Sequence, residues 1–349
     1  MKYIDFLGIA PFIALALGVS SCDKNDAVSQ ESDNNAFIIK AQIGEAQDNN
    51  VSSRATVNNA DGKSFTWQKD DKFDIYFSSS SSVKQVFAIN NETITDGGKS
   101  ADFVCENFNK PSDGDKYYSF YPNNGFTYSS GAYSFKLPES VYSQSANNDT
   151  EHLKSGLAMV ATGNYADIQA GLKFEQKTSL FRIGVTNNRA ASVTIKSLKI
   201  VSTTYACFGN KYTYKDAEKD VETYEGSSKE VVLTLNGETG ISVNTNDDLK
   251  AYTLTVPGGV IRENELFHIE AVLSDGSTVQ SEGFFGYDIN KEIDLGIDPE
   301  TEEPIGNHWL PGYYYEFLLD LNEVGLDFKG VTISSFADGG SNDFTVEIQ

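Results

Sequence analysis

Residues that could carry out catalysis are few in this chain and do not combine into a recognised arrangement. No HExxH spacing and no GxSxG nucleophile elbow occurs. Gly62-Lys63-Ser64 and Gly98-Lys99-Ser100 end like phosphate-binding loops, but the first glycine of such a loop is missing from both, which indicates simple turns. The histidines are His152, His268 and His308. We therefore predict that the protein is not an enzyme and uses no cofactor.

Metal ligation is equally unsupported. The acidic stretch at residues 298–303 lacks the spaced oxygen ligands and the glycine of a calcium loop, which favours a solvated loop. Cys105 and Cys207 form no CxxC motif and have no histidine at zinc-ligand spacing. Because they fall in different halves of the chain, we expect buried free thiols rather than a disulfide. No metal site is predicted.

The remaining cysteine, Cys22, stands in a setting suited to covalent lipidation. Residues 1–21 have the layout of a signal peptide: Lys2, an apolar run, and the small residues Val19-Ser20-Ser21. The tetrad that ends at Cys22 resembles a bacterial lipobox, in which the cysteine sulfur receives diacylglycerol. The alternative is cleavage by a general signal peptidase, which would leave Cys22 an incidental thiol. The lipidated form predicts firm membrane anchoring, because more than one acyl chain would be attached.

Residues 22–54 contain a polar tether, a short strand and an arginine. Residues 36–43 alternate, placing four apolar side chains on one face and Lys40 and Gln42 on the other, which predicts a strand. The apolar four are Phe37, Ile39, Ala41 and Ile43. Arg54 follows in a polar, serine-containing stretch, where a trypsin-like protease could cut between Arg54 and Ala55. The alternative is a solvated linker residue.

Composition and charge exclude several classes of function. The chain has 27 basic and 50 acidic residues, a formal net charge of −23, which repels nucleic-acid phosphates and anionic membrane surfaces. We therefore predict no nucleic-acid partner. A length of 349 residues exceeds what one compact core usually holds, so two domains are expected.

The body of the chain is a series of short apolar strands separated by Gly, Asn, Asp and Ser, which predicts an all-β fold. We divide it into an N-terminal β-sandwich at residues 55–172 and a C-terminal β-sandwich at residues 173–349. Ser64–Trp67 and Phe73–Phe77 flank an acidic turn and predict a hairpin. Within the C-terminal segment 331–349, apolar residues alternate up to the end of the sequence; they are Phe344, Val346 and Ile348.

Several local patterns, in their order, resemble the fimbrillin family, the self-polymerising type V pilin subunits of Bacteroidota. Trp67 with Asp70-Asp71 and the strand that follows is similar to a recurrent tryptophan and acidic turn of that family. Three further segments are similar to its aromatic segment, its paired strands and its glycine-aromatic entry to the last strands: Tyr117–Pro122, Leu172–Glu175 with Ser179–Ile183, and Trp309–Tyr315. A histidine that many members carry near the paired strands is absent.

The resemblance implies two transthyretin-like β-sandwich domains in tandem. It implies a lipoprotein precursor of the cell outer membrane and surface, activated by cleavage at Arg54-Ala55. Cleavage would remove the strand of Phe37, Ile39, Ala41 and Ile43 and leave an open groove. The segment of Phe344, Val346 and Ile348 would then be the donor strand that fills the groove of a neighbouring subunit, although it could also be an ordinary last strand. Because such a contact is head-to-tail and does not close, it predicts a filament.

Three functions stay open on the sequence. The first is a stalk or tip subunit of a fimbrium, whose partners are other fimbrial subunits and a receptor on a host or bacterial surface. The second is an anchor or accessory subunit that keeps its lipid. The third is a surface glycan-binding lipoprotein, for which tyrosine-rich stretches would supply stacking platforms.

Overall fold

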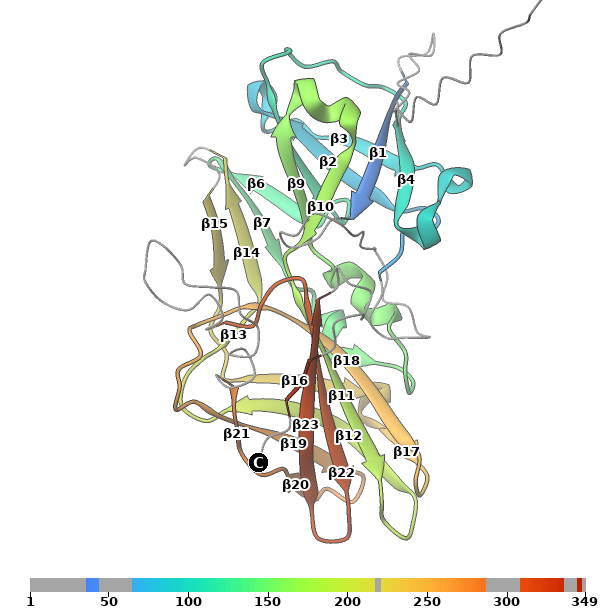
Figure 1. Cartoon of the computed structure of the whole chain (residues 1–349), viewed down its shortest axis with the longest axis vertical. Coiled ribbons are helices and arrows are strands. Elements are labelled where there is room, and N and C mark those ends of the chain that lie inside the picture. Colours follow the sequence, from blue (N-terminus) through green and yellow to red (C-terminus); the bar gives the residue numbers. More distant parts are fainter. Residues whose placement is uncertain (1–35, 44–64, 217–220, 287–307, 336–343, 347–349) are drawn as a thin grey trace, which may run out of the picture.

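The computed structural model describes residues 36–43, 65–216, 221–286, 308–335 and 344–346, and within them β-strands are the main secondary structure. The predicted all-β class is confirmed. Figure 1 shows an elongated molecule with one group of strands at one end, a larger group at the other, and a small sheet at the side between them.

The first group of strands closes into a barrel. Its inner face carries phenylalanines from successive strands, among them Phe73, Phe87 and Phe103, and alternation along each strand places them there. In barrel order the strands are β1 (Phe37–Ile43), β10 (Leu172–Gln176), β9 (Met159–Asn164), β5 (Lys116–Tyr121), β2 (Lys72–Phe77), β3 (Gln85–Ile89) and β4 (Ser100–Cys105).

A four-stranded sheet lies beside the barrel and packs its aromatic face against it. Tyr133 lies 4.8 Å from Tyr76 and 4.5 Å from Phe120 between ring centroids, which joins this sheet to β2 and β5. Its strands come from both halves of the sequence, in the order β15 (Val221–Glu225), β14 (Lys211–Lys215), β7 (Ala132–Lys136) and β6 (Phe126–Ser129).

Two further sheets form the other end of the molecule and enclose a second apolar core around Trp309, Phe181 and Phe317. One sheet runs β13 (Phe208–Gly209), β18 (Asp248–Pro257), β11 (Ser179–Asn187), β22 (Tyr313–Leu321), β23 (Leu326–Ser335) and β24 (Phe344–Val346). The other runs β20 (Thr278–Gln280), β19 (Leu266–Leu273), β12 (Val193–Ser202), β16 (Glu230–Leu235) and β8 (Ser143–Gln144), with β17 (Ile241–Val243) on β12 and β21 (Phe284–Phe285) on β19.

Short 3₁₀ turns connect the strands. They are η1 (Ser78–Ser80), η2 (Asn91–Thr93), η3 (Asp96–Gly98), η4 (Glu139–Tyr142), η5 (Glu151–Gly156), η6 (Tyr165–Ala170) and η7 (Asn236–Glu238). No helix among the described residues has the length and apolar character needed to cross a lipid bilayer.

Segments cross the sequence division that we placed after residue 172. Strand β8 precedes it yet pairs with β16 at the far end, and β14 and β15 follow it yet pair with the β7 side of the small sheet. The first core likewise contains Tyr212, Tyr252 and Tyr314 from the second half. The division into domains at 55–172 and 173–349 stays a prediction.

The predicted hairpin of Ser64–Trp67 with Phe73–Phe77 is wrong. Both edges of β2 are occupied by other strands, β3 and β5, so no edge is left for the preceding segment. The backbone N–H of Trp67 donates instead to the carbonyl of Gly98, at 2.8 Å. The indole ring lies inside the barrel, in edge contact with Phe103 and Phe174, because burial of that ring outweighs local pairing.

Both described cysteines are free and buried, as expected from the sequence. Cys105 belongs to the first core and Cys207 to the second. Burial raises the pKa of each thiol, which keeps both protonated and unreactive at neutral pH.

Candidate assembly site around the first strand

Strand β1 shows the alternation predicted for it. Its apolar side chains point into the barrel, and the exposed fraction is 9% for Phe37 and 3% or less for the other three, Ile39, Ala41 and Ile43. Lys40 is exposed on the outer face, with Ile38 and Gln42 partly buried. Fully burying a large apolar side chain stabilises a fold by about 1.5–3 kcal/mol, so this face supplies several kcal/mol.

The barrel is closed by β1, which lies between two strands rather than at an edge (Figure 1). It runs antiparallel to β4, with Phe37 opposite Cys105 and Gln42 opposite Ser100. On its other side it runs parallel to β10, with Ala41 opposite Leu172. Strand β1 therefore supplies the hydrogen-bonding partners for two neighbours, which would both become open edges in its absence.

Aromatic rings line the seat of β1. The ring of Phe37 stacks on Phe108, with centroids 4.1 Å apart, and Phe108 follows β4 in a loop that folds back over the strand. Ile39 is opposite Phe103 and Ile43 is opposite Phe174, both of which are fully buried. The seat is an apolar groove along the barrel wall, and its walls belong to β4 and β10.

Gly171 allows β1 to approach the start of β10. Its φ is +97°, a conformation that L side chains rarely adopt, and an added Cβ would lie 3.0 Å from the carbonyl oxygen of Lys40. Our reading of the sequence missed this residue. The only signal was a glycine placed directly before the apolar strand Leu172–Glu175.

A partly buried carboxyl group, Asp71, is linked to the indole of Trp67 through Tyr121. Asp71 accepts hydrogen bonds from the Tyr121 hydroxyl, at 3.0 Å, and from the Gln68 backbone N–H, at 2.7 Å. Burial raises its pKa to about 6, an effect that these two donors oppose. Tyr121 in turn packs edge-on against Trp67, so this polar group holds an aromatic corner of the barrel.

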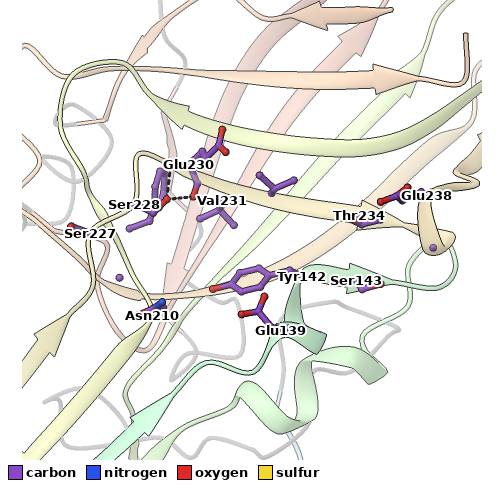
Figure 2. Close-up of a pocket in the computed structure, with 14 residues that line it drawn as sticks. Glu139, Tyr142, Ser143, Asn210, Ser227, Ser228, Glu230, Val231, Thr234 and Glu238 are labelled. Carbon is purple, nitrogen blue, oxygen red and sulfur yellow. Dashed lines mark hydrogen bonds between the residues drawn. The ribbon is translucent and has the colours of Figure 1, made fainter. Parts of the chain in front are cut away.

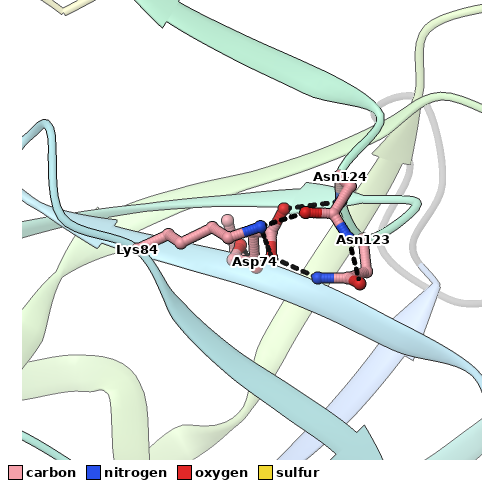
Figure 3. A network of polar contacts seen from close by, with 5 residues as sticks. Asp74, Lys84, Asn123 and Asn124 are labelled. Atoms are coloured by element: carbon pink, nitrogen blue, oxygen red, sulfur yellow. Dashed lines mark hydrogen bonds and ion pairs between the residues drawn. The ribbon is translucent and has the colours of Figure 1, made fainter.

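A second polar network fixes the loop that leads from β5 into the small sheet (Figure 3). Asp74 is fully buried; it accepts from the Asn123 side-chain amide at 2.5 Å and from the Asn124 backbone N–H at 2.8 Å. Lys84 lies 3.6 Å from the same carboxylate and also bonds Asn124. The network satisfies the buried charge and holds the loop in place.

Where β10 ends, a buried lysine joins the barrel to the small sheet. The Lys177 ammonium lies 2.9 Å from Glu175 and 2.8 Å from Glu222 of β15. Burial alone would lower the pKa of Lys177, but the carboxylates of Glu222 and Glu175 outweigh it and raise that pKa. Strand β11 begins at Ser179, so the wall of the β1 seat continues directly into the far sheet.

The other predicted site residues are placed only in part. Cys22, Arg54, Ala55 and Ile348 lie outside the described residues. Phe344 and Val346 belong to β24, which pairs antiparallel with the outer edge of β23, so the C-terminal segment adds to the chain's own far sheet. The structure does not bring this segment to the β1 seat of the same chain.

The predicted non-catalytic histidines are not brought together. The Nε2 atom of His152 lies 2.8 Å from the carbonyl oxygen of Tyr252, and burial lowers the pKa of His152. His268 lies on β19, 3.4 Å from Glu270 of the same strand. The contact of His152 joins segments far apart in the sequence, whereas that of His268 is local to its strand.

Comparison with known proteins assigns the class. A fimbrillin-like family model matches residues 53–335, which is most of the chain. The chain belongs to the fimbrillin-like family. No curated protein sequence matches it.

Several solved structures are similar to this chain. A candidate cell adhesion protein of Bacteroides uniformis is 13% identical, with 82% of this chain and 98% of that one covered and a TM-score of 0.46. The tip fimbrial protein Mfa3 of Porphyromonas gingivalis is 8% identical, with coverage of 85% and 98% and a TM-score of 0.39. The fimbrial anchor protein Mfa2 of the same organism is 7% identical, with coverage of 85% and 98% and a TM-score of 0.36.

Proposed function

We propose that this protein is a structural subunit of a cell-surface fimbrium that is exported as a lipoprotein, processed after Arg54 and polymerised by strand exchange. The observation that carries the proposal is the position of β1, an N-terminal strand that closes the barrel between β4 and β10. The processing point lies between β1 and the rest of the barrel in sequence, so a single cut would detach the strand from everything that follows.

Loss of β1 would destabilise the barrel and favour the binding of a replacement strand. It would expose the apolar groove under Phe37, Ile39 and Ile43 and leave backbone groups of β4 and β10 unpaired. An extended segment with the same alternation satisfies both requirements, because strand addition supplies main-chain hydrogen bonds and places every second side chain in the groove.

The C-terminal segment is the proposed donor. Its apolar residues Phe344, Val346 and Ile348 have the same spacing as those of β1. Among the described residues β24 pairs with three residues of β23 and lies at the edge of its sheet, so its exchange would leave the other strands of that sheet paired. Donation from one chain to the barrel of the next is head-to-tail and gives an open polymer.

The remaining parts of the proposal follow the family. Cys22 carries the lipid that holds the precursor on the outer membrane, and the two ends of the molecule are transthyretin-like domains. The function is structural rather than enzymatic, and it serves adhesion and biofilm contact through other fimbrial subunits. The alternative role is that of an anchor or accessory subunit, which keeps its lipid and is not cut.

The test is replacement of the processing arginine. Arg54→Ala should leave a full-length, detergent-soluble protein and abolish high-mass ladders in Western blots of surface fractions, because β1 stays covalently attached and occupies its seat. Arg262→Ala is the matched control, since Arg262 is exposed and stacks on Tyr205 at 4.3 Å far from the barrel. Ladders that persist in Arg54→Ala would contradict strand exchange at this site. A wild-type protein that is never shortened would show the anchor role.

A further inference from the structure

The second molecular end has an open strand edge that is unrelated to the β1 seat. Strand β16 pairs with β12 along one edge, but on the other edge only Thr234 and Leu235 are paired, with β8. The Ser202 backbone N–H donates to the Lys229 carbonyl at 2.7 Å, so Lys229 and every second residue after it direct their backbone groups toward β12. It follows that Glu230, Val232 and Thr234 direct their backbone groups away from β12.

These three residues differ in what they meet on that edge. At Glu230 the backbone carbonyl and N–H are both bonded by the Ser228 hydroxyl, at 2.7 and 3.1 Å. Thr234 is paired with Ser143 of β8. Between them, the N–H and C=O of Val232 have no hydrogen-bond partner among the described residues.

A cavity of about 670 Å³ opens along this unpaired stretch (Figure 2). Its volume lies within the range of ligand sites. Figure 2 shows the Tyr142 ring lying below β16, with Glu139 beside it. The other walls come from the turn at Ser227-Ser228, from Asn210, and from Glu238 of η7.

The negative charge of the cavity favours a positively charged ligand. Glu139, Glu230 and Glu238 line it, and none of the described lining residues is a lysine or arginine. Glu230 lies 4.0 Å from Lys199, whereas Glu139 and Glu238 form no ion pair with described residues. Burial and the neighbouring Glu139 raise the pKa of Tyr142 to about 12, so the phenol stays neutral and its ring can face a cation.

We propose that this edge of β16 binds an extended peptide segment of another protein, which carries a lysine or arginine side chain. The peptide adds a short strand whose backbone bonds the free N–H and C=O of Val232, and its basic side chain lies against Glu139 and the Tyr142 ring. An unpaired strand backbone is the complement of another strand, which favours a peptide over a glycan. This site lies in the sheet of β12 and β16, so it is independent of the strand exchange proposed above.

The test uses full-length protein that is not cut at Arg54, so that it stays monomeric, and two capped pentapeptides, Thr-Val-Lys-Val-Thr and Thr-Val-Glu-Val-Thr, in calorimetric titrations. The lysine peptide should bind and the glutamate peptide should bind at least about tenfold more weakly, since it meets like charge. The variant Val232→Pro removes the N–H that faces the cavity and leaves the β12 ladder intact, so it should lose binding by about tenfold. Val232→Thr keeps the N–H and should bind like wild type.

Glu139→Gln gives a second route if the proline variant does not fold. Glu139 is exposed, so its amide should leave the fold unchanged while weakening the lysine peptide and not the glutamate peptide. The proposal is overturned if neither peptide binds at about 1 mM, if both bind equally, or if Val232→Pro binds like wild type. Binding of a chito-oligosaccharide in place of the lysine peptide would also overturn it and would assign the cavity to sugars.

Discussion

At the scale of single residues, the barrel contains a carboxyl group in an aromatic environment and a glycine with a positive φ, and both contribute to its structure. Asp71 is a partly buried carboxyl group that accepts hydrogen bonds from the Tyr121 hydroxyl and from the Gln68 backbone N–H. Gly171 has a backbone conformation reserved for glycine directly against β1. Each has a consequence that a single substitution can measure.

Asp71 should make stability depend on pH. Its pKa rises from 3.8 to about 6 on folding, so the folded state holds the proton more tightly than the unfolded state. Stability from this group is therefore present below pH 4 and lost as pH rises to 6, by roughly 3 kcal/mol at most. Urea unfolding at several pH values should show a steeper fall for wild type than for Asp71→Asn over this window. Parallel curves for the two proteins would refute the assignment.

Gly171→Ala should loosen β1. The added Cβ would lie 3.0 Å from the Lys40 carbonyl, and the positive φ adds strain, for a total of about 1–3 kcal/mol. Hydrogen exchange of the β1 amides should accelerate and unfolding should require less urea. Gly276→Ala is the matched control, because Gly276 has a φ of +86° but no atom near an added Cβ. Equal effects of the two changes would mean that contact with β1 plays no part.

At the scale of elements, β1 packs as an integral strand of the barrel. Its position in the sequence, before Arg54, would nevertheless allow one cut to separate it from all the other strands. Its apolar face is buried in the barrel core, yet it precedes all other described strands and pairs with two that come later. The opposed position of Phe37 and Cys105 offers a way to fix it in place, since both side chains are buried on the same face.

Phe37→Cys should lock β1 through a disulfide with the native Cys105. Directly opposed residues of antiparallel strands have Cβ atoms about 4.5–5.5 Å apart, near the range that a disulfide spans, and the cell surface is oxidising. The variant should still be cut after Arg54 but form no ladders until dithiothreitol is added. Phe37→Ser, which removes the ring without adding a thiol, should be cut and polymerise. Ladders from the unreduced cysteine variant would show that β1 need not leave.

At the scale of the whole molecule, the proposed groove and the proposed donor strand belong to different sheets. The groove is part of the barrel, and β24 pairs with β23 at the edge of the far sheet. A subunit whose donor does not reach its own groove can satisfy both only through neighbours, which gives a linear assembly.

A chain that ends at Asp343 should terminate such an assembly. It keeps the barrel and can accept a strand, but it lacks Phe344, Val346 and Ile348 and has none to donate. Alone it should be processed and stay monomeric; mixed with wild type at roughly one part in ten, it should shorten the filaments seen by electron microscopy. Circular dichroism should show an unchanged sheet signal. Polymerisation of the truncated chain by itself would rule out this donor.

Much of the architecture could be predicted because period-two alternation is a local property. The run from Phe37 to Ile43 shows its buried face without any knowledge of its neighbours, and the all-β class follows from many such runs. The hairpin at Trp67 failed for a non-local reason: both edges of β2 were taken by β3 and β5, and the indole found a better site in the barrel.

The sequence by itself determined the all-β class, the apolar face of segments such as Phe37–Ile43, and which short motifs resemble those of fimbrillins. Only the tertiary structure decided that β1 closes a barrel between β4 and β10, that Gly171 makes room for it, and that β16 keeps an open edge at Val232. Strand partners are chosen by contacts between residues far apart in the chain. Local alternation specifies a strand's faces but leaves its edges undetermined.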